Sequence, residues 1–90
     1  MLDEQTVPKL RAGVKFRFDA VRNTWILLAP ERMFQPDEVA VEILKLIDGH
    51  RTLGNIIDTL TAQFEAPRGR IADDVAAMLQ NLSDRGAVQL

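Results

Sequence analysis

The clearest pattern along the chain is a change of period, from alternation in the N-terminal third to helical spacing in the rest. Residues 14–19 alternate strictly, with Val14, Phe16 and Phe18 on one side and charged residues between them, which is typical of a half-buried strand. The run from Thr24 to Ala29 is apolar on both sides and predicts a central strand that is covered on both faces. Two adjacent antiparallel strands are therefore expected first.

A short third strand is predicted at Arg32 to Gln35, between two prolines. Pro30 has no N–H to donate and ends the preceding strand, and Pro36 stops the third one. Because no further strand follows, we expect this strand to be an open sheet edge. Its unpaired N–H and C=O groups could then bond an extended peptide from another molecule.

Three amphipathic helices follow the strands. Asp37 is a good N-cap for the first, which Gly49 is placed to end, and Thr52 is placed to cap the second. Pro67 can open the third helix and Gly86 closes it. The expected buried stripes are Ala40, Ile43, Leu44 and Ile47, then Leu53, Ile56, Ile57, Leu60 and Phe64, then Ile71, Val75, Met78, Leu79 and Leu82.

Strands first and helices second imply an α+β fold, in which three helices pack on one face of an N-terminal three-stranded antiparallel sheet. The last two helices also have the spacing of a helix-turn-helix, so the arrangement is winged-helix-like. Nothing divides residues 1–90 into two domains. Residues 1–12 show no period and are expected to be a partly disordered lead-in, and the tail AVQL is too short to assign.

Composition narrows the function classes. The 90 residues include no cysteine and one histidine, and the net charge is −2. Without cysteine there is no thiolate nucleophile, disulfide or thiolate metal site, and one histidine does not by itself build a zinc centre. The negative charge disfavours nucleic acid and anionic lipid as partners. No run is long and apolar enough to span a membrane and no signal peptide is recognisable, so we expect a cytoplasmic protein.

Candidate catalytic residues are isolated. His50 has no second histidine to share a site with, and Ser83 lacks the strand-to-helix turn of a nucleophile elbow. Asp73 and Asp74 are adjacent on a helix and point about 100° apart, so the two carboxylates cannot converge on one proton or metal. No glycine-rich phosphate loop follows a strand. The sequence therefore predicts a protein that is not an enzyme, with no catalytic residue, metal or cofactor.

An ordered set of short motifs covers residues 8–88. It comprises P-x-L at 8–10 with Gly13, FRFD at 16–19, R-x-x-W at 22–25, WILLAPER at 25–32, EIL-x-L-x-DG at 42–49, RTL at 51–53 and DV-x-x-x-L-x-x-L at 74–82. This set resembles the PqqD family of pyrroloquinoline quinone biosynthesis. Gln35 and Pro36 stand where the family pattern is more apolar, which shortens the edge strand, and Asn55 replaces a more usual glutamate.

The resemblance implies a non-catalytic peptide chaperone, a recognition domain for ribosomally made and modified peptides. Such a protein binds the precursor peptide PqqA and presents it to PqqE, the radical S-adenosylmethionine enzyme that crosslinks a glutamate and a tyrosine of the peptide. In related domains the peptide lies as an added strand against the third strand, and the third helix closes the groove. The peptide-binding residues expected on this basis are Arg32, Met33, Phe34 and Gln35 on the strand and Arg70, Asp74, Ala77, Met78 and Asn81 on the helix.

Two alternatives stay open, a winged-helix nucleic-acid-binding protein and a protein that binds the small quinone product. The third helix begins with Arg68 and Arg70 but then carries Asp73 and Asp74, which gives that half no net positive charge for DNA. The open edge also predicts self-association. We expect mainly monomer when dilute, and an edge-paired or domain-swapped homodimer at crystal concentration.

Overall fold

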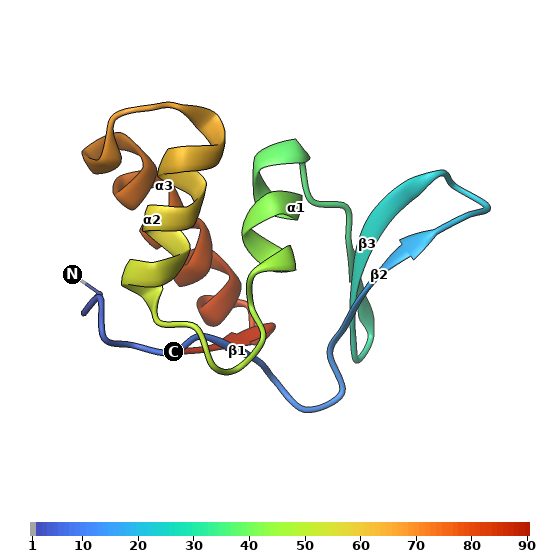
Figure 1. Ribbon diagram of the computed structural model, residues 1–90. Helices are drawn as coiled ribbons and strands as arrows, with labels where there is room; N and C mark the ends of the chain where they lie inside the picture. Colours follow the sequence, from blue (N-terminus) through green and yellow to red (C-terminus); the bar gives the residue numbers. More distant parts are fainter. Residues whose placement is uncertain (1) are drawn as a thin grey trace.

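The computed structural model describes residues 2–90, which form three helices and two small sheets (Figure 1). The elements are β1 (Lys9–Leu10), β2 (Lys15–Asp19), β3 (Thr24–Ala29), β4 (Arg32–Phe34), α1 (Glu38–Lys45), α2 (Leu53–Phe64), α3 (Arg68–Asp84) and β5 (Val88–Gln89). The predicted α+β fold, an antiparallel three-stranded sheet followed by three helices, is confirmed.

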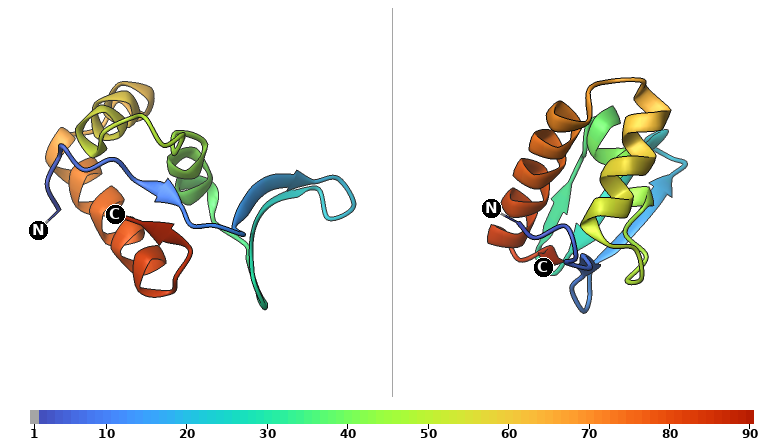
Figure 2. Two further views of the ribbon diagram at one scale, coloured as in Figure 1. Left: turned by 90° about the horizontal axis from the view of Figure 1, so that it is seen from below. Right: turned by 60° about the vertical axis from the view of Figure 1, so that its left-hand side comes forward.

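The larger sheet has the strand order β2-β3-β4, which leaves β4 at an edge. Leu27 on the central strand lies opposite Phe16 of β2 and Phe34 of β4, and it is fully buried. The far end of the β2–β3 hairpin projects away from the helices (Figure 2). The helices therefore cover the part of the sheet that lies around Leu27 and β4.

Two predicted boundaries are corrected. The edge strand ends at Phe34, so Gln35 lies just outside it. Helix α1 begins after the predicted cap, where the Asp37 carboxylate accepts the Ala40 N–H at 2.8 Å, but it ends at Lys45 rather than at Gly49. The carboxylate of Asp48 accepts the backbone N–H groups of His50 and Arg51, at 2.8 Å each, in a turn of its own. Such local side-chain bonds compete with continuation of a helix.

The buried stripes of the helices largely follow the predicted spacing. The exceptions are Phe64, whose side chain is 41% exposed, and Val41, which is buried although it lay outside the predicted stripe. Ala40, Ile47 and Met78 are only partly buried. The core cluster joins residues of all three helices to Leu27 and to the C-terminal residues Ala87 and Val88.

Residues 1–12 were expected to form a partly disordered lead-in; Met1 lies outside the described residues, and parts of residues 2–12 form backbone hydrogen bonds with segments far along the chain. Lys9 and Leu10 form β1, which pairs with β5 (Figure 2). Further up the chain, the C=O groups of Glu4 and Thr6 accept the N–H groups of the first turn of α2 at 2.9 and 2.7 Å. A strand of two residues cannot show a period, so the sequence carried no signal for β1 or β5.

Within residues 2–90, no helix has the length and apolar character needed to cross a membrane. The same residues contain no group of three or more His, Cys, Asp or Glu side chains placed to hold a metal ion.

Candidate functional site

A hollow of about 400 Å3 lies between the edge strand β4 and the C-terminal half of α3. Its strand side is formed by residues 33–36, and its helix side by Met78, Asn81 and Leu82. Ala40 and Leu44 of α1 close it between the two. Leu44 and Leu82 are buried and Met78 is partly buried, so apolar side chains form the inner wall of this hollow, while polar and charged side chains such as Asp37, Asn81 and Arg85 also line it.

A second hollow, of about 330 Å3, continues the first toward the N-terminal half of α3. The two share Asp37, Ala40 and Met78, and the second reaches Asp74. Together they form one feature, which we call the β4–α3 groove. Its lining residues are Leu27, 33–37, Val39, Ala40, Ile43, Leu44, Asp74, Ala77, Met78, Asn81, Leu82 and Arg85.

Seven of the nine site residues expected from the sequence line this groove. They are Met33, Phe34, Gln35, Asp74, Ala77, Met78 and Asn81. Arg32 and Arg70 do not line it. Arg32 stands at the start of β4, and Arg70 lies one turn of α3 before Asp74, beyond the end of the groove.

Sequence reasoning missed the contribution of α1 and of the residue that follows α3. The guanidinium of Arg85 lies 5.8 Å from the centroid of the Phe34 ring, in cation–π contact, and it lines the same end of the groove. No spacing rule places Arg85 beside Phe34, because only the packing of α3 on the sheet brings the two together. Ala40 was predicted to be core, but it is half-exposed on the groove wall.

The two faces of β4 carry different side chains. Phe34 is half-buried and packs against the core, whereas Met33 points to the opposite face and is 43% exposed. A guanidinium nitrogen of Arg22 lies 3.0 Å from the Met33 sulfur. The helix-facing side of β4 is therefore represented in the groove mainly by Phe34.

The backbone of β4 leaves donors on its free side. The β3–β4 hairpin turns through Pro30 and Glu31, with Ala29 opposite Arg32 as its closing pair. Because such a closing pair is hydrogen-bonded and the antiparallel ladder alternates, Phe34 bonds to its partner in β3. The N–H groups of Met33 and Gln35 are then directed away from the sheet, toward the side where a further strand would lie.

Arg68, one of the two arginines considered for nucleic-acid binding, is engaged within the fold. Its guanidinium donates to Glu4 at 2.6 Å and to Asp58 at 2.7 Å. The bond from Arg68 lowers the pKa of Glu4, and the two carboxylates raise the pKa of Arg68. This arginine ties the N-terminal segment to α2 and α3 and is not free to contact a phosphate.

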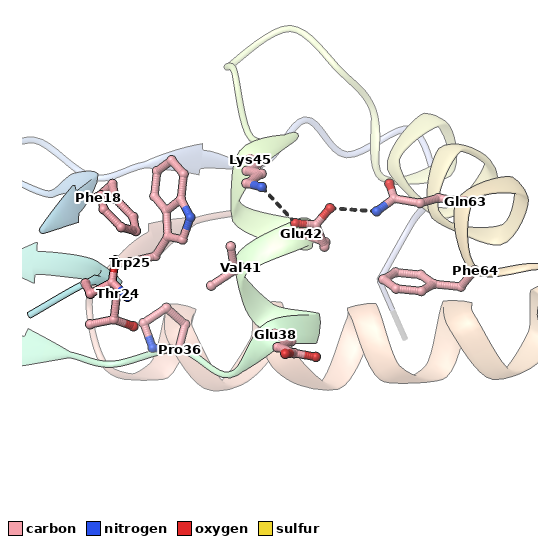
Figure 3. A pocket seen from close by; sticks show the side chains of 11 residues that line it. Phe18, Thr24, Trp25, Pro36, Glu38, Val41, Glu42, Lys45, Gln63 and Phe64 are labelled. Atoms are coloured by element: carbon pink, nitrogen blue, oxygen red, sulfur yellow. Dashed lines mark hydrogen bonds and ion pairs between the residues drawn. The ribbon is translucent and has the colours of Figure 1, made fainter. Parts of the chain in front are cut away.

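A further cavity of about 450 Å3 lies between the β2–β3 hairpin, α1 and the end of α2 (Figure 3), and it shares only Pro36 with the β4–α3 groove. Trp25 stacks on Phe16 with ring centroids 4.8 Å apart, and the Lys45 ammonium lies 5.2 Å from the Trp25 ring. Glu42 accepts from Lys45 at 2.9 Å and from Gln63 at 2.6 Å (Figure 3). These two bonds lower the pKa of Glu42. No candidate site residue was predicted in this cavity.

Solved structures place the fold in the class of peptide-recognition domains. The chain resembles "Lasso peptide synthetase B1 complexed with the leader peptide" with a TM-score of 0.75 over 94% of this chain and 100% of that one, and the 22% identity makes this a likeness of fold. It also resembles the solution structure of the PqqD part of Methylobacterium extorquens PqqCD, described as a stand-alone recognition element for ribosomally synthesized and post-translationally modified peptides. That match has a TM-score of 0.83, 39% identity, and covers 100% of this chain and 96% of the other.

The family follows from the sequence comparison. Residues 24–88 match the family model "Coenzyme PQQ synthesis protein D (PqqD)". A "PqqA binding protein" of Rhodopseudomonas palustris strain HaA2 is 51% identical over 85 residues, which is 94% of this chain and 83% of that protein. The chain therefore belongs to the PqqD family, and the resemblance read from its motifs is confirmed.

Proposed function

We propose that this chain is a non-catalytic peptide chaperone of pyrroloquinoline quinone biosynthesis. It binds the precursor peptide PqqA in the β4–α3 groove and presents it to the radical S-adenosylmethionine enzyme PqqE in the cytosol. The observation that carries this proposal is an open sheet edge, β4, that borders a groove with both apolar and charged lining residues, closed on its other side by α3. Membership of a family with named PqqA-binding members supports the same assignment.

Peptide binding would proceed by strand addition. The outward N–H groups of Met33 and Gln35 donate to the peptide backbone, which supplies affinity that does not depend on sequence. Every second side chain of the peptide turns into the groove, against Phe34 and Met78. Methionine is unbranched and polarisable, so Met78 can adapt its shape to different apolar residues.

A bound peptide would leave the cavity around Trp25 uncovered. That cavity uses Val41, Glu42 and Lys45 of α1, whereas the groove uses Ala40 and Leu44, which lie on a different face of the helix. A single peptide-recognition domain of this shape can therefore hold PqqA on one flank of α1 while its other flank stays open to PqqE.

The experiment is a titration of the 15N-labelled protein with PqqA. We expect amide shifts in 32–35, around Ala40 and in 74–85, because these backbones border the groove. Shifts confined to the α2–α3 turn on titration with duplex DNA, or to the Trp25 cavity on titration with the free quinone, would favour the two alternatives instead.

A matched pair of variants makes the test sharper. Ala77 is exposed and lines the groove, and Ala62 is exposed on α2 away from it. In Ala77→Arg the new side chain is held over the groove by Asp74 at the i−3 position, so we expect PqqA affinity to fall about tenfold, which corresponds to about 1.4 kcal/mol. Ala62→Arg has Asp58 at its i−4 position on α2 and should bind PqqA as the wild type does. Equal affinity of both variants would refute binding in this groove.

A further inference from the structure

The charged side chains of the β4–α3 groove are sorted by sign along its length. Arg85 lines the end next to Phe34, and Arg32, which lines neither hollow, lies two residues before Phe34 on the same face of β4. Asp74 lines the opposite end, and Asp37 lies between the two ends because it lines both hollows. Arg70 lies beyond this acidic end and lines neither hollow.

These four charges are available to a ligand. In the described part of the chain, 2–90, none of them takes part in an ion pair, although Asp37 accepts the Ala40 N–H as the cap of α1. All four side chains belong to exposed residues. The ion pairs that do form lie elsewhere and engage Arg22, Lys45, Arg51 and Arg68.

The direction of β4 determines which end of the groove meets the N-terminal end of a bound peptide and which meets its C-terminal end. Both pairings in the three-stranded sheet are antiparallel, and an antiparallel ladder is slightly more stable per residue than a parallel one. β4 starts at Arg32 and leads toward Asp37, so a peptide antiparallel to it enters with its N-terminal end beside Asp37 and Asp74. Its later residues then reach Arg85 and Arg32.

The distance between the two ends of the groove determines how far apart along the peptide the basic and acidic residues must lie. At a rise of about 1.5 Å per residue, Asp74 and Arg85 are about 16 Å apart along the axis of α3. An extended peptide covers about 16 Å in about five residues at ~3.3 Å each.

From this arrangement we infer that the affinity of the groove for a peptide depends on the order of basic and acidic residues along that peptide. This inference rests on the proposed peptide-binding function. The groove selects a segment in which a basic residue, or the N-terminal amine, precedes an acidic residue by about four or six positions, an even number that turns both side chains toward the groove. The basic group lies beside Asp37 and Asp74, and the acidic group lies beside Arg85 and Arg32. Apolar side chains between them fill the groove. The four charged residues thus fix peptide direction and register, which the backbone bonds of an added strand leave open.

Two synthetic peptides of identical composition test the order. Both alternate apolar and small polar residues; one has a lysine near its N-terminus and a glutamate about four or six residues later, on the same face of the strand, and the other has the two exchanged. We expect the first to bind about tenfold more tightly at low salt, because both of its contacts change from repulsion to attraction. The preference should shrink at high salt, since exposed charges are screened.

A charge-reversed protein provides the reciprocal test. In the double variant Asp74→Lys, Arg85→Glu, each end of the groove holds one positive and one negative charge, so the preference between the two peptides should be lost. Arg70→Glu, on the same helix but outside the groove, is the control and should keep the wild-type preference. Equal affinity of the two peptides for the wild type would overturn the inference.

A nitroxide label on the N-terminus of PqqA locates the peptide ends directly. Broadening of the amides of Asp37 and Asp74 is expected, and broadening of Arg32 and Arg85 instead would overturn the inferred direction. Either result still requires that PqqA occupies the groove. A PqqA titration that shifts no groove amide would refute the proposed function itself, so the two failures are distinguishable.

Discussion

Replacing Gln35 with proline tests strand addition at a single backbone atom. The residue lies just past the end of β4, where the alternation of the ladder directs its N–H away from β3. Proline removes that donor. The fold should tolerate the change, because the Gln35 side chain is exposed and a residue that precedes Pro36 already favours the extended backbone.

The expected loss is that of one hydrogen bond between protein and peptide. A net value of about 0.5–1.5 kcal/mol corresponds to a rise in Kd of about two- to twelvefold, at about 1.4 kcal/mol for each factor of ten. The loss is partial because the outward N–H of Met33 remains. Titration calorimetry with PqqA measures it, and thermal unfolding followed by emission of Trp25, the one tryptophan in the chain, checks that stability is kept.

Gln35→Ala is the matched control, because it removes the side chain and keeps the N–H. It should bind PqqA within about twofold of the wild type, a difference of about 0.4 kcal/mol. If Gln35→Pro also bound like the wild type while remaining folded, strand addition at this edge would be wrong. If Gln35→Ala lost as much affinity as Gln35→Pro, the contact would belong to the side chain and the assignment of the backbone donor would fail.

Further predictions concern stability, pH and self-association. Ile57→Ala truncates a side chain that is 2% exposed and should cost about 2–5 kcal/mol in urea unfolding, whereas Asp37→Ala, which removes the cap on the Ala40 N–H, should cost about 0.5–2 kcal/mol. Bonds from Lys45 and Gln63 lower the pKa of Glu42 from its ordinary 4.5, so its contribution to stability is complete above that pH and is lost as pH falls through the folded-state pKa; Glu42→Gln should show a smaller drop in melting temperature on acidification, and an equal drop would contradict this. If copies of the chain pair through β4, peptide and self-association compete, and saturating PqqA should lower the dimer fraction in sedimentation; a dimer that persists would place its interface elsewhere.

Features set by neighbours in the sequence could be predicted from it. Asp37 and Thr52 accept backbone N–H groups of the helices that follow them, as predicted, because a cap needs only residues three positions away. Alternation gave the strand that starts the sheet, and Pro30 and Pro36 bracketed a short edge. The helical period also predicted the face of α3 that lines the groove. It could not predict how far along α3 the groove extends, so Arg70 was counted among the expected peptide-binding residues although it lies beyond the groove.

The contacts between segments far apart along the chain were decided only by the tertiary structure. β1 and β5 each supply two residues, too few for a period, and they pair only because the ends of the chain meet beside the helices. Arg85 lies over Phe34 because α3 packs across the sheet. Ala40 and Leu44 line the groove because α1 lies between β4 and α3. The local pattern of hydrogen bonds and apolar residues fixes the elements, whereas the angle and offset at which buried side chains interdigitate fix the groove and the order of its charges.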